Sequence, residues 1–321
     1  MDHLSDLDHI RRRPGMYIGS TGQTGIQHLV FEVVDNAVDQ FLANKATCIV
    51  VRIVGRTIHI DDNGEGYPFD YLDVDGVSLG VKYLTRIHNS NTVDNHTPHI
   101  HANGFGCGLF ALNALTQRLV VTAVRSGTLF RQSYSRGVLV SSTQEPDASG
   151  ALGTAVEFEL DEMIFGNQMV DIEQIRIKLR RLSFLFPGLA VHFQEEKFHS
   201  TKGLVDLLRT EMGIESQPVF SICLQLGGTI VAAAAAGNTD QRTEIASFAN
   251  AAPTIENSSH VKGLKRALRR AKWKPAGAAI SVILSDPSFA GPTRQVLHMP
   301  GLEKPISDLL AVAIKQFRSE V

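Results

Sequence analysis

The sequence predicts an α+β protein of two domains, and three observations support this prediction. The 321 residues exceed what one hydrophobic core usually holds. Apolar residues recur at helical spacing in some segments and alternate as in strands in others. With 43% hydrophobic and 20% charged residues, the chain can bury a large core. A break in the pattern near Pro218 assigns residues 1–215 to the first domain and residues 216–321 to a smaller α+β domain.

The first domain is predicted to combine helices with a mainly antiparallel sheet. Helical spacing predicts helices over Gly25–Leu42, Val77–Ile87, Gly108–Leu115, Ile172–Phe184 and Gly203–Glu211. Alternation bounded by turn residues predicts strands over Cys48–Ile53, Thr57–Asp61, Leu119–Val124, Thr128–Tyr134, Gly137–Ser142 and Ala155–Leu160. Around the second of these helices, residues 62–108 are rich in Gly, Asn, Asp and His, which is typical of long loops that hold a ligand.

The second domain is predicted from the same two periodicities. Strand candidates lie in Val219–Ala236, Thr243–Phe248 and Ala278–Leu284, and helices are predicted over Val261–Lys272 and Ile306–Phe317. The alanine run 232–236 has helical propensity, but it follows Thr229, Ile230 and Val231 directly, so we predict a strand there.

Composition excludes several classes of protein. Thirty-one basic and 33 acidic residues give a net charge of −2, so no positive field over the whole chain indicates nucleic acid or an anionic membrane. Three cysteines, Cys48, Cys107 and Cys223, are an odd number without CxxC spacing, which argues against a disulfide framework and a structural zinc. Neither a membrane-spanning stretch nor a signal peptide is apparent. We therefore expect a cytoplasmic protein without a membrane partner.

A stripe of polar residues marks the first long helix. On a helix through residues 29–42, Glu32, Asp35, Asn36 and Asp39 fall within one narrow stripe, and apolar residues cover the rest. A carboxylate at Glu32 can take a proton from water, and the amide oxygen of Asn36, one turn on, can bind a hard cation. By itself, such a stripe is more often the exposed face of an amphipathic helix.

Two glycine motifs follow. Asp62, at the end of a strand, can accept a hydrogen bond from an exocyclic amine, while Gly64 and Gly66 would let a ligand approach the backbone. The segment 103–108, Asn-Gly-Phe-Gly-Cys-Gly, opens a helix whose free N–H groups suit phosphate. Each motif alone is weak. The chain has no G-x-x-x-x-G-K-[ST] motif, which excludes a P-loop protein.

Together and in this order, the three motifs resemble the GHKL ATPase superfamily, and the surrounding sequence is similar to the ATPase half of the gyrase B and topoisomerase IV ParE subunits. The resemblance runs from about Ile10 to Phe317 and includes residues 10–19, 31–39, 153–154, 182–185 and 285–287. It implies a two-layer Bergerat α/β sandwich followed by a ribosomal-S5-domain-2-like transducer domain, with ATP and Mg²⁺ as ligands.

The resemblance also implies roles for individual residues. Glu32 would be the general base and Asn36 the magnesium ligand. Asp62 would bind the adenine amino group with help from Thr154, and an arginine beside the adenine pocket is matched by Arg131. The phosphates would be wrapped by Asn103, Gly104, Phe105, Gly106, Cys107 and Gly108. In the transducer loop, where the family has Gln-Thr-Lys at the γ-phosphate, this chain has Pro292, Thr293 and Arg294, and Arg294 keeps the positive charge.

Several departures from the family fall at positions that would affect how the nucleotide is coupled to movement of the protein, rather than whether the nucleotide binds. Pro292 stiffens the transducer loop, Phe105 stands where gyrases usually carry His, Gln40 replaces an acid, and Glu65 replaces an arginine. The segment before residue 280 is short, and the N-terminal arm is a stub. Slow hydrolysis is therefore expected. No Toprim domain or DNA-cleavage tyrosine domain is seen, so the chain is either a free-standing ATPase or a fragment, and its many departures from the family favour the first.

Three functions are compatible with these motifs. The leading one is an Mg-ATP-driven dimerisation switch. The alternative is a nucleotide-sensing regulator or decoy with little turnover that pairs with a partner subunit or gyrase. A histidine kinase is disfavoured, because such kinases lack the Pro-Gly-Met-Tyr-Ile-Gly segment at residues 14–19. The basic run 265–274 leaves DNA open as a partner, and His96, His99 and His101 are interpreted as loop residues rather than a zinc site.

Overall fold

The computed structural model describes residues 5–87, 100, 108–291 and 295–320. Within them the chain forms two compact units. The first unit takes the described residues up to 87 together with 108–180 and 189–198, and the second takes residues 181–188 and the chain from residue 199. The second unit thus begins earlier in the chain than the domain boundary predicted at residue 216, which stays a prediction.

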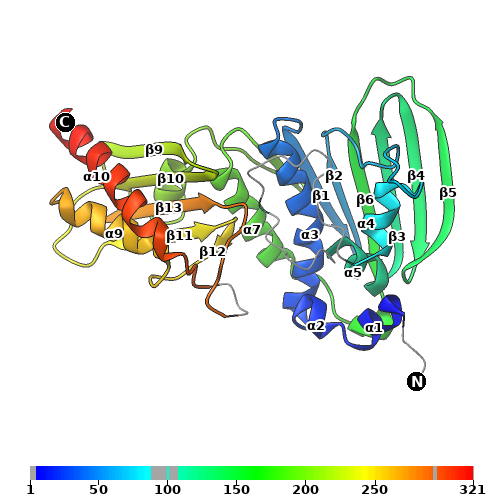
Figure 1. The fold of residues 1–321 in the computed structure, drawn as a ribbon. Helices are drawn as coiled ribbons and strands as arrows, with labels where there is room; N and C mark the ends of the chain where they lie inside the picture. The colour runs from blue at the N-terminus through cyan, green and yellow to red at the C-terminus, as the bar shows by residue number, and fades with distance from the viewer. Residues whose placement is uncertain (1–4, 88–99, 101–107, 292–294, 321) are drawn as a thin grey trace. The chain divides into compact units, whose positions relative to one another are not determined.

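The first unit is built on an eight-stranded sheet with the strand order β5-β4-β3-β6-β2-β1-β7-β8 (Figure 1). All neighbouring strands are antiparallel except β1 and β7, so the prediction of a mainly antiparallel sheet is confirmed. The strands are β1 (Cys48–Val54), β2 (Thr57–Asp62), β3 (Thr116–Arg125), β4 (Thr128–Ser135), β5 (Val138–Pro146), β6 (Gly153–Leu160), β7 (Ala190–Phe193) and β8 (Glu196–Phe198).

Helices pack on one face of this sheet. α3 (Gln23–Leu42) contacts β1 and β2, and α5 (Gly108–Leu115) contacts β3 and β4 (Figure 1). Side chains that face these helices are buried, among them Ile49, Ile60 and Phe158. The intervening side chains of each strand point to the opposite face, which we call the open face, because successive residues of a strand alternate between faces. The other helices of the chain up to residue 210 are α1 (Asp6–Arg12), α2 (Gly15–Ile18), α4 (Leu79–Thr85), α6 (Glu162–Phe165), α7 (Ile172–Leu185) and α8 (Leu204–Thr210).

The second unit contains a five-stranded sheet with the order β12-β11-β13-β10-β9. Its strands are β9 (Val219–Leu226), β10 (Thr229–Ala236), β11 (Glu244–Ala249), β12 (Ala252–Pro253) and β13 (Gly277–Ile283), and its helices include α9 (Ser259–Arg270), the 3₁₀ turn η1 (Pro300–Leu302) and α10 (Glu303–Glu320). The alanine run lies in β10, as predicted, and pairs with Ala278 and Ala279 of β13. The predicted segment 219–236 is two strands rather than one, because Gly227 and Gly228 form a turn at its middle.

Most predicted elements are confirmed with their ends shifted by a few residues. Sequence reasoning missed short elements, namely α1, α2, α6, β7, β8 and β12. In the described part of the chain, no helix combines the length and the apolar character needed to cross a bilayer.

Candidate functional site

Glu32 is held in the interior by the packing of α3. Its side chain is 4% exposed, and its Oε1 lies 3.0 Å from Nε2 of His28, one turn earlier. Gly108, the first residue of α5, lies against the same carboxylate: a Cβ at this position would be 1.8 Å from Oε2 of Glu32. A side chain at position 108 would therefore displace the carboxylate of Glu32, which the positive N-terminal end of α5 meets.

Asn36 lies one helical turn beyond Glu32, and its side chain is partly exposed. In the described part of the chain, no group of three or more His, Cys, Asp or Glu side chains is placed to hold a metal ion. Mg²⁺ usually takes one or two protein oxygens together with substrate phosphates and water. An amide oxygen one turn from a carboxylate fits such a site.

Asp62 ends β2 on the helix-covered face of the sheet. Its Oδ1 accepts a hydrogen bond from the backbone N–H of Gly64 at 2.8 Å. Burial has the largest effect on Asp62 and raises its pKa to about 6. Hydrogen bonds from the backbone of Gly64 and Thr154 act in the opposite direction and only partly offset this rise. Thr154 is the direct neighbour of Asp62 on β6. The structure therefore brings Asp62 and Thr154 together.

The loop after Asp62 needs its glycines. Gly66 has a φ of +82°, and a Cβ there would lie 2.4 Å from the carbonyl oxygen of Val124. A Cβ on Gly64 would lie 2.8 Å from Oδ1 of Asp62 and 3.0 Å from Oε1 of Gln40, a residue of α3. Gly66 thus lets the backbone of the loop lie close to β3, and Gly64 lets it lie close to α3.

The structure adds Arg125 to this loop, which sequence reasoning missed. Its Nη1 donates to the carbonyl oxygens of Glu65 at 3.3 Å and Gly66 at 3.1 Å, and its Nε lies 3.0 Å from Asp70. Glu65 also pairs with Lys45 at 2.9 Å. Arg125 stands at the end of β3 with no motif around it, so no pattern in the sequence could have revealed this contact.

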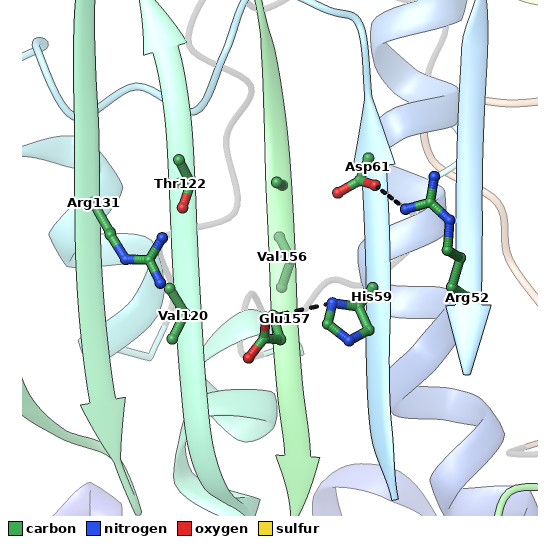
Figure 2. Close-up of a pocket in the computed structure, with 9 residues that line it drawn as sticks. Arg52, His59, Asp61, Val120, Thr122, Arg131, Val156 and Glu157 are labelled. Atoms are coloured by element: carbon green, nitrogen blue, oxygen red, sulfur yellow. Dashed lines mark hydrogen bonds and ion pairs between the residues drawn. The ribbon is translucent and has the colours of Figure 1, made fainter. Parts of the chain in front are cut away.

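Arg131 is not brought to the Asp62 loop. The cross-strand row of Asp62 contains Thr154, Ala123 and Phe130, whereas Arg131 belongs to the next row, with Asp61, Ala155 and Thr122. Adjacent rows point to opposite faces of a sheet. Arg131 therefore lies on the face opposite to Asp62, the open face, where Figure 2 shows it on the strand next to that of Thr122.

The remaining predicted residues lie outside the described part of the chain. They are Asn103, Gly104, Phe105, Gly106 and Cys107 of the phosphate motif, and Thr293 and Arg294 of the transducer loop. Pro292 and the histidines 96, 99 and 101 also fall there.

Comparison with known proteins agrees with this geometry. The family profile "Histidine kinase-, DNA gyrase B-, and HSP90-like ATPase" matches residues 21–163. The DNA gyrase B protein of Borrelia hermsii is 31% identical over 342 residues, which cover 96% of this chain and 54% of the relative. The DNA topoisomerase 4 B protein of Mycoplasma genitalium is 32% identical over 271 residues, which cover 81% of this chain and 43% of the relative. The chain thus spans about half the length of the curated relatives it matches.

Solved structures show the same fold. The 43K ATPase domain of Thermus thermophilus gyrase B, in complex with an aminocoumarin, matches with a TM-score of 0.83 and 27% identity over 98% of this chain and 90% of that one. The gyrase B structure of Myxococcus xanthus, 22% identical with a TM-score of 0.80 over 97% of this chain and 95% of that one, supports the fold alone. The predicted Bergerat fold is confirmed. Residues 21–163 therefore belong to the ATPase domain family shared by histidine kinases, DNA gyrase B and HSP90, and the chain is homologous to the ATPase region of gyrase B.

Proposed function

We propose that this chain binds ATP with Mg²⁺ and hydrolyses it, as a gyrase-B-like ATPase that acts as a nucleotide-driven dimerisation switch. The observation that carries the proposal is the layout of α3. Glu32 meets the first residue of α5 at one point of the helix, and Gln40 meets the Asp62 loop about 12 Å further along the axis. One helix would thus separate the phosphate end from the adenine end of the same site.

At the adenine end, Asp62 would accept a hydrogen bond from the exocyclic amine of the base. Gly64 and Gly66 would let the ring approach the backbone, and Thr154 would add a polar contact beside Asp62. Adenine is favoured over guanine, because guanine presents a carbonyl at the equivalent ring position and would place two acceptors face to face.

At the phosphate end, Glu32 would take the proton from a water that attacks the γ-phosphorus in line with the leaving oxygen. Burial of Glu32 beside the N-terminus of α5 keeps bulk water from this carboxylate. Asn36 would hold Mg²⁺ through its amide oxygen, and the metal would neutralise charge on the phosphates. The resemblance assigns Asn103–Gly108, Thr293 and Arg294 to the phosphates, with Arg294 as the cation at the γ-phosphate.

The test of this assignment replaces Glu32 by Gln, which removes the base and preserves the shape of the side chain. We expect ATP turnover to fall by about 10²-fold or more while ATP affinity changes little. Turnover is followed by phosphate release and affinity by calorimetry. Glu159→Gln, on the open face of β6, is the control and should keep parental turnover. Parental turnover in Glu32→Gln would overturn the assignment.

The alternative function, a regulator that binds ATP with little turnover, is favoured by one observation. The departures Gln40 and Glu65 are built into the Asp62 loop: Gln40 accepts from the backbone N–H of Glu65 at 3.3 Å, and Glu65 pairs with Lys45 and Arg125. These residues support the binding end of the site rather than the hydrolytic end. Turnover by the parental chain separates the two functions, since the regulator predicts tight ATP binding without phosphate release.

The partners and cellular location stay proposals. We propose an ATP-dependent homodimer in the cytoplasm, with a protein partner related to gyrase or topoisomerase IV for the regulatory alternative. Similarity over nearly the whole chain is to gyrase B proteins, which supports this assignment over a histidine kinase.

A further inference from the structure

The open face of the eight-stranded sheet contains a pocket of about 270 Å³ that the proposed ATPase reaction does not use (Figure 2). It is lined from β1, β2, β6, β3 and β4. The apolar floor of the pocket is formed by the small side chain of Ala155 and by Val120, which is 3% exposed. Since Asp62 and Thr154 point to the other face, this pocket is separate from the adenine end of the ATP site.

The acidic residues of this pocket are already paired. Asp61 lies 3.4 Å from Nη1 of Arg52, and Glu157 lies 3.4 Å from Nδ1 of His59 (Figure 2). Glu157 also pairs with Arg118. Since each of these cations already faces a carboxylate, an anionic ligand needs a further cation in the pocket.

Arg131 is that cation. It lies at the opposite wall, on β4, next to Thr122 in the cross-strand row. Within residues that the structure describes, its guanidinium makes no ion pair or hydrogen bond. Its planar fork of N–H donors matches a carboxylate in a two-bond geometry, and the Thr122 hydroxyl offers a further donor beside it.

The surroundings select the kind of anion. Asp61 and Glu157 balance most of the positive charge of the lining, so a monoanion is favoured over a dianion such as phosphate. The apolar floor of Ala155 and Val120 suits a small hydrocarbon or aromatic body, and the volume limits the ligand to a small molecule. We propose that this pocket binds a small organic carboxylate whose charged group pairs with Arg131 and whose apolar body lies over Ala155. This inference does not rest on the proposed ATPase function.

The test uses benzoate as the probe and follows the methyl NMR signals of Ala155 and Val120 in the full chain. We expect saturable shifts of both signals with benzoate and none with benzamide, its uncharged analogue. Arg131→Gln should weaken benzoate binding about tenfold or more, and Arg131→Lys should retain part of it, because the charge remains but the fork is lost. Ala155→Leu, which fills the floor, should abolish binding without changing any charge.

Arg266→Gln is the matched control, since Arg266 is an exposed arginine of the second unit, and it should bind benzoate as the parental chain does. Thermal unfolding of each variant checks that it is folded. The proposal is overturned if benzamide produces the same shifts, if folded Arg131→Gln binds benzoate as tightly as the parent, or if inorganic phosphate binds more tightly than benzoate.

Discussion

At the scale of single residues, the neighbours Asp61 and Asp62 show how strand alternation separates two chemistries. Asp62 faces the helices, where burial raises its pKa to about 6. Asp61 faces the open side and pairs with Arg52. The two residues are joined by one peptide bond, yet strand alternation places their side chains on opposite faces of the sheet.

The pKa of Asp62 predicts a pH dependence. Because the folded chain holds this proton more tightly than the unfolded chain, the stability from this group is present below about pH 4 and is lost as pH rises through about 6. Asp62→Asn removes the ionised form, so we expect the variant to gain stability over the parent at pH 7.5 and little at pH 4. Urea unfolding at the two pH values measures this difference, with Glu159→Gln on the open face of β6 as the control.

The same carboxylate predicts how ATP affinity follows pH. Ionised Asp62 is the better acceptor for the adenine amine, so parental affinity should fall as pH drops through about 6. Calorimetric affinities at pH 7.5 and 5.5 should show a smaller fall in Asp62→Asn than in the parent. Protonation of the ATP phosphates affects both proteins equally, so the difference between the two falls reports on Asp62. A parental fall no larger than that of Asp62→Asn would count against Asp62 as the adenine acceptor.

Gly108 gives a further prediction at this scale. A methyl group at this position meets the carboxylate of Glu32, so Gly108→Ala should displace that side chain. We expect a loss of about 1–3 kcal/mol in unfolding free energy and a marked fall in ATP turnover. Gly15→Ala, at a helical glycine where a Cβ meets nothing within 4 Å, should leave both quantities near the parental values. Urea unfolding and phosphate release measure them, and unchanged turnover in Gly108→Ala would contradict the contact.

At the scale of elements, periodicity predicts long helices and strands well and short ones poorly. α3 and α5 repeat their apolar residues over several turns, so both were predicted, α5 with its bounds. β7 and β8 have four and three residues, too few for an alternation to stand out. Their place in the sheet follows from pairing with β1, a long-range contact that local pattern does not contain.

For the candidate site too, residues within local patterns were predicted and residues placed by long-range pairing were not. Glu32 and Asp62 were predicted because they stand in motifs, and strand register then places Thr154 beside Asp62. The positions of Arg125 and Arg131 were not predictable, because both lie on neighbouring strands and only the register decides which face each arginine takes.

α9 carries the prediction that concerns DNA. Its apolar face is buried in the core of the second unit, while Arg266 and Arg269 are exposed and form no ion pair with described residues. Lys265 and Arg270, by contrast, pair with Glu256 and Asp308.

The DNA hypothesis predicts that Arg266→Gln with Arg269→Gln weakens duplex binding and lowers its salt dependence. The double variant Lys265→Gln with Arg270→Gln, which removes equal charge, should weaken binding less. Fluorescence anisotropy over a salt series measures both, and equal losses would reject a specific role for the free cations.

At the scale of the whole molecule, an ATP-driven dimer has a kinetic signature. If only the dimer hydrolyses ATP, turnover per chain must rise with protein concentration and level off when dimers predominate. Sedimentation with adenylyl imidodiphosphate and Mg²⁺ should show dimers at concentrations where the chain without nucleotide is monomeric. Glu32→Gln should form these dimers with ATP itself, because it binds the nucleotide and does not consume it. Turnover per chain that is constant across concentrations, together with a monomer in the presence of the analogue, would remove the switch and leave a monomeric ATPase.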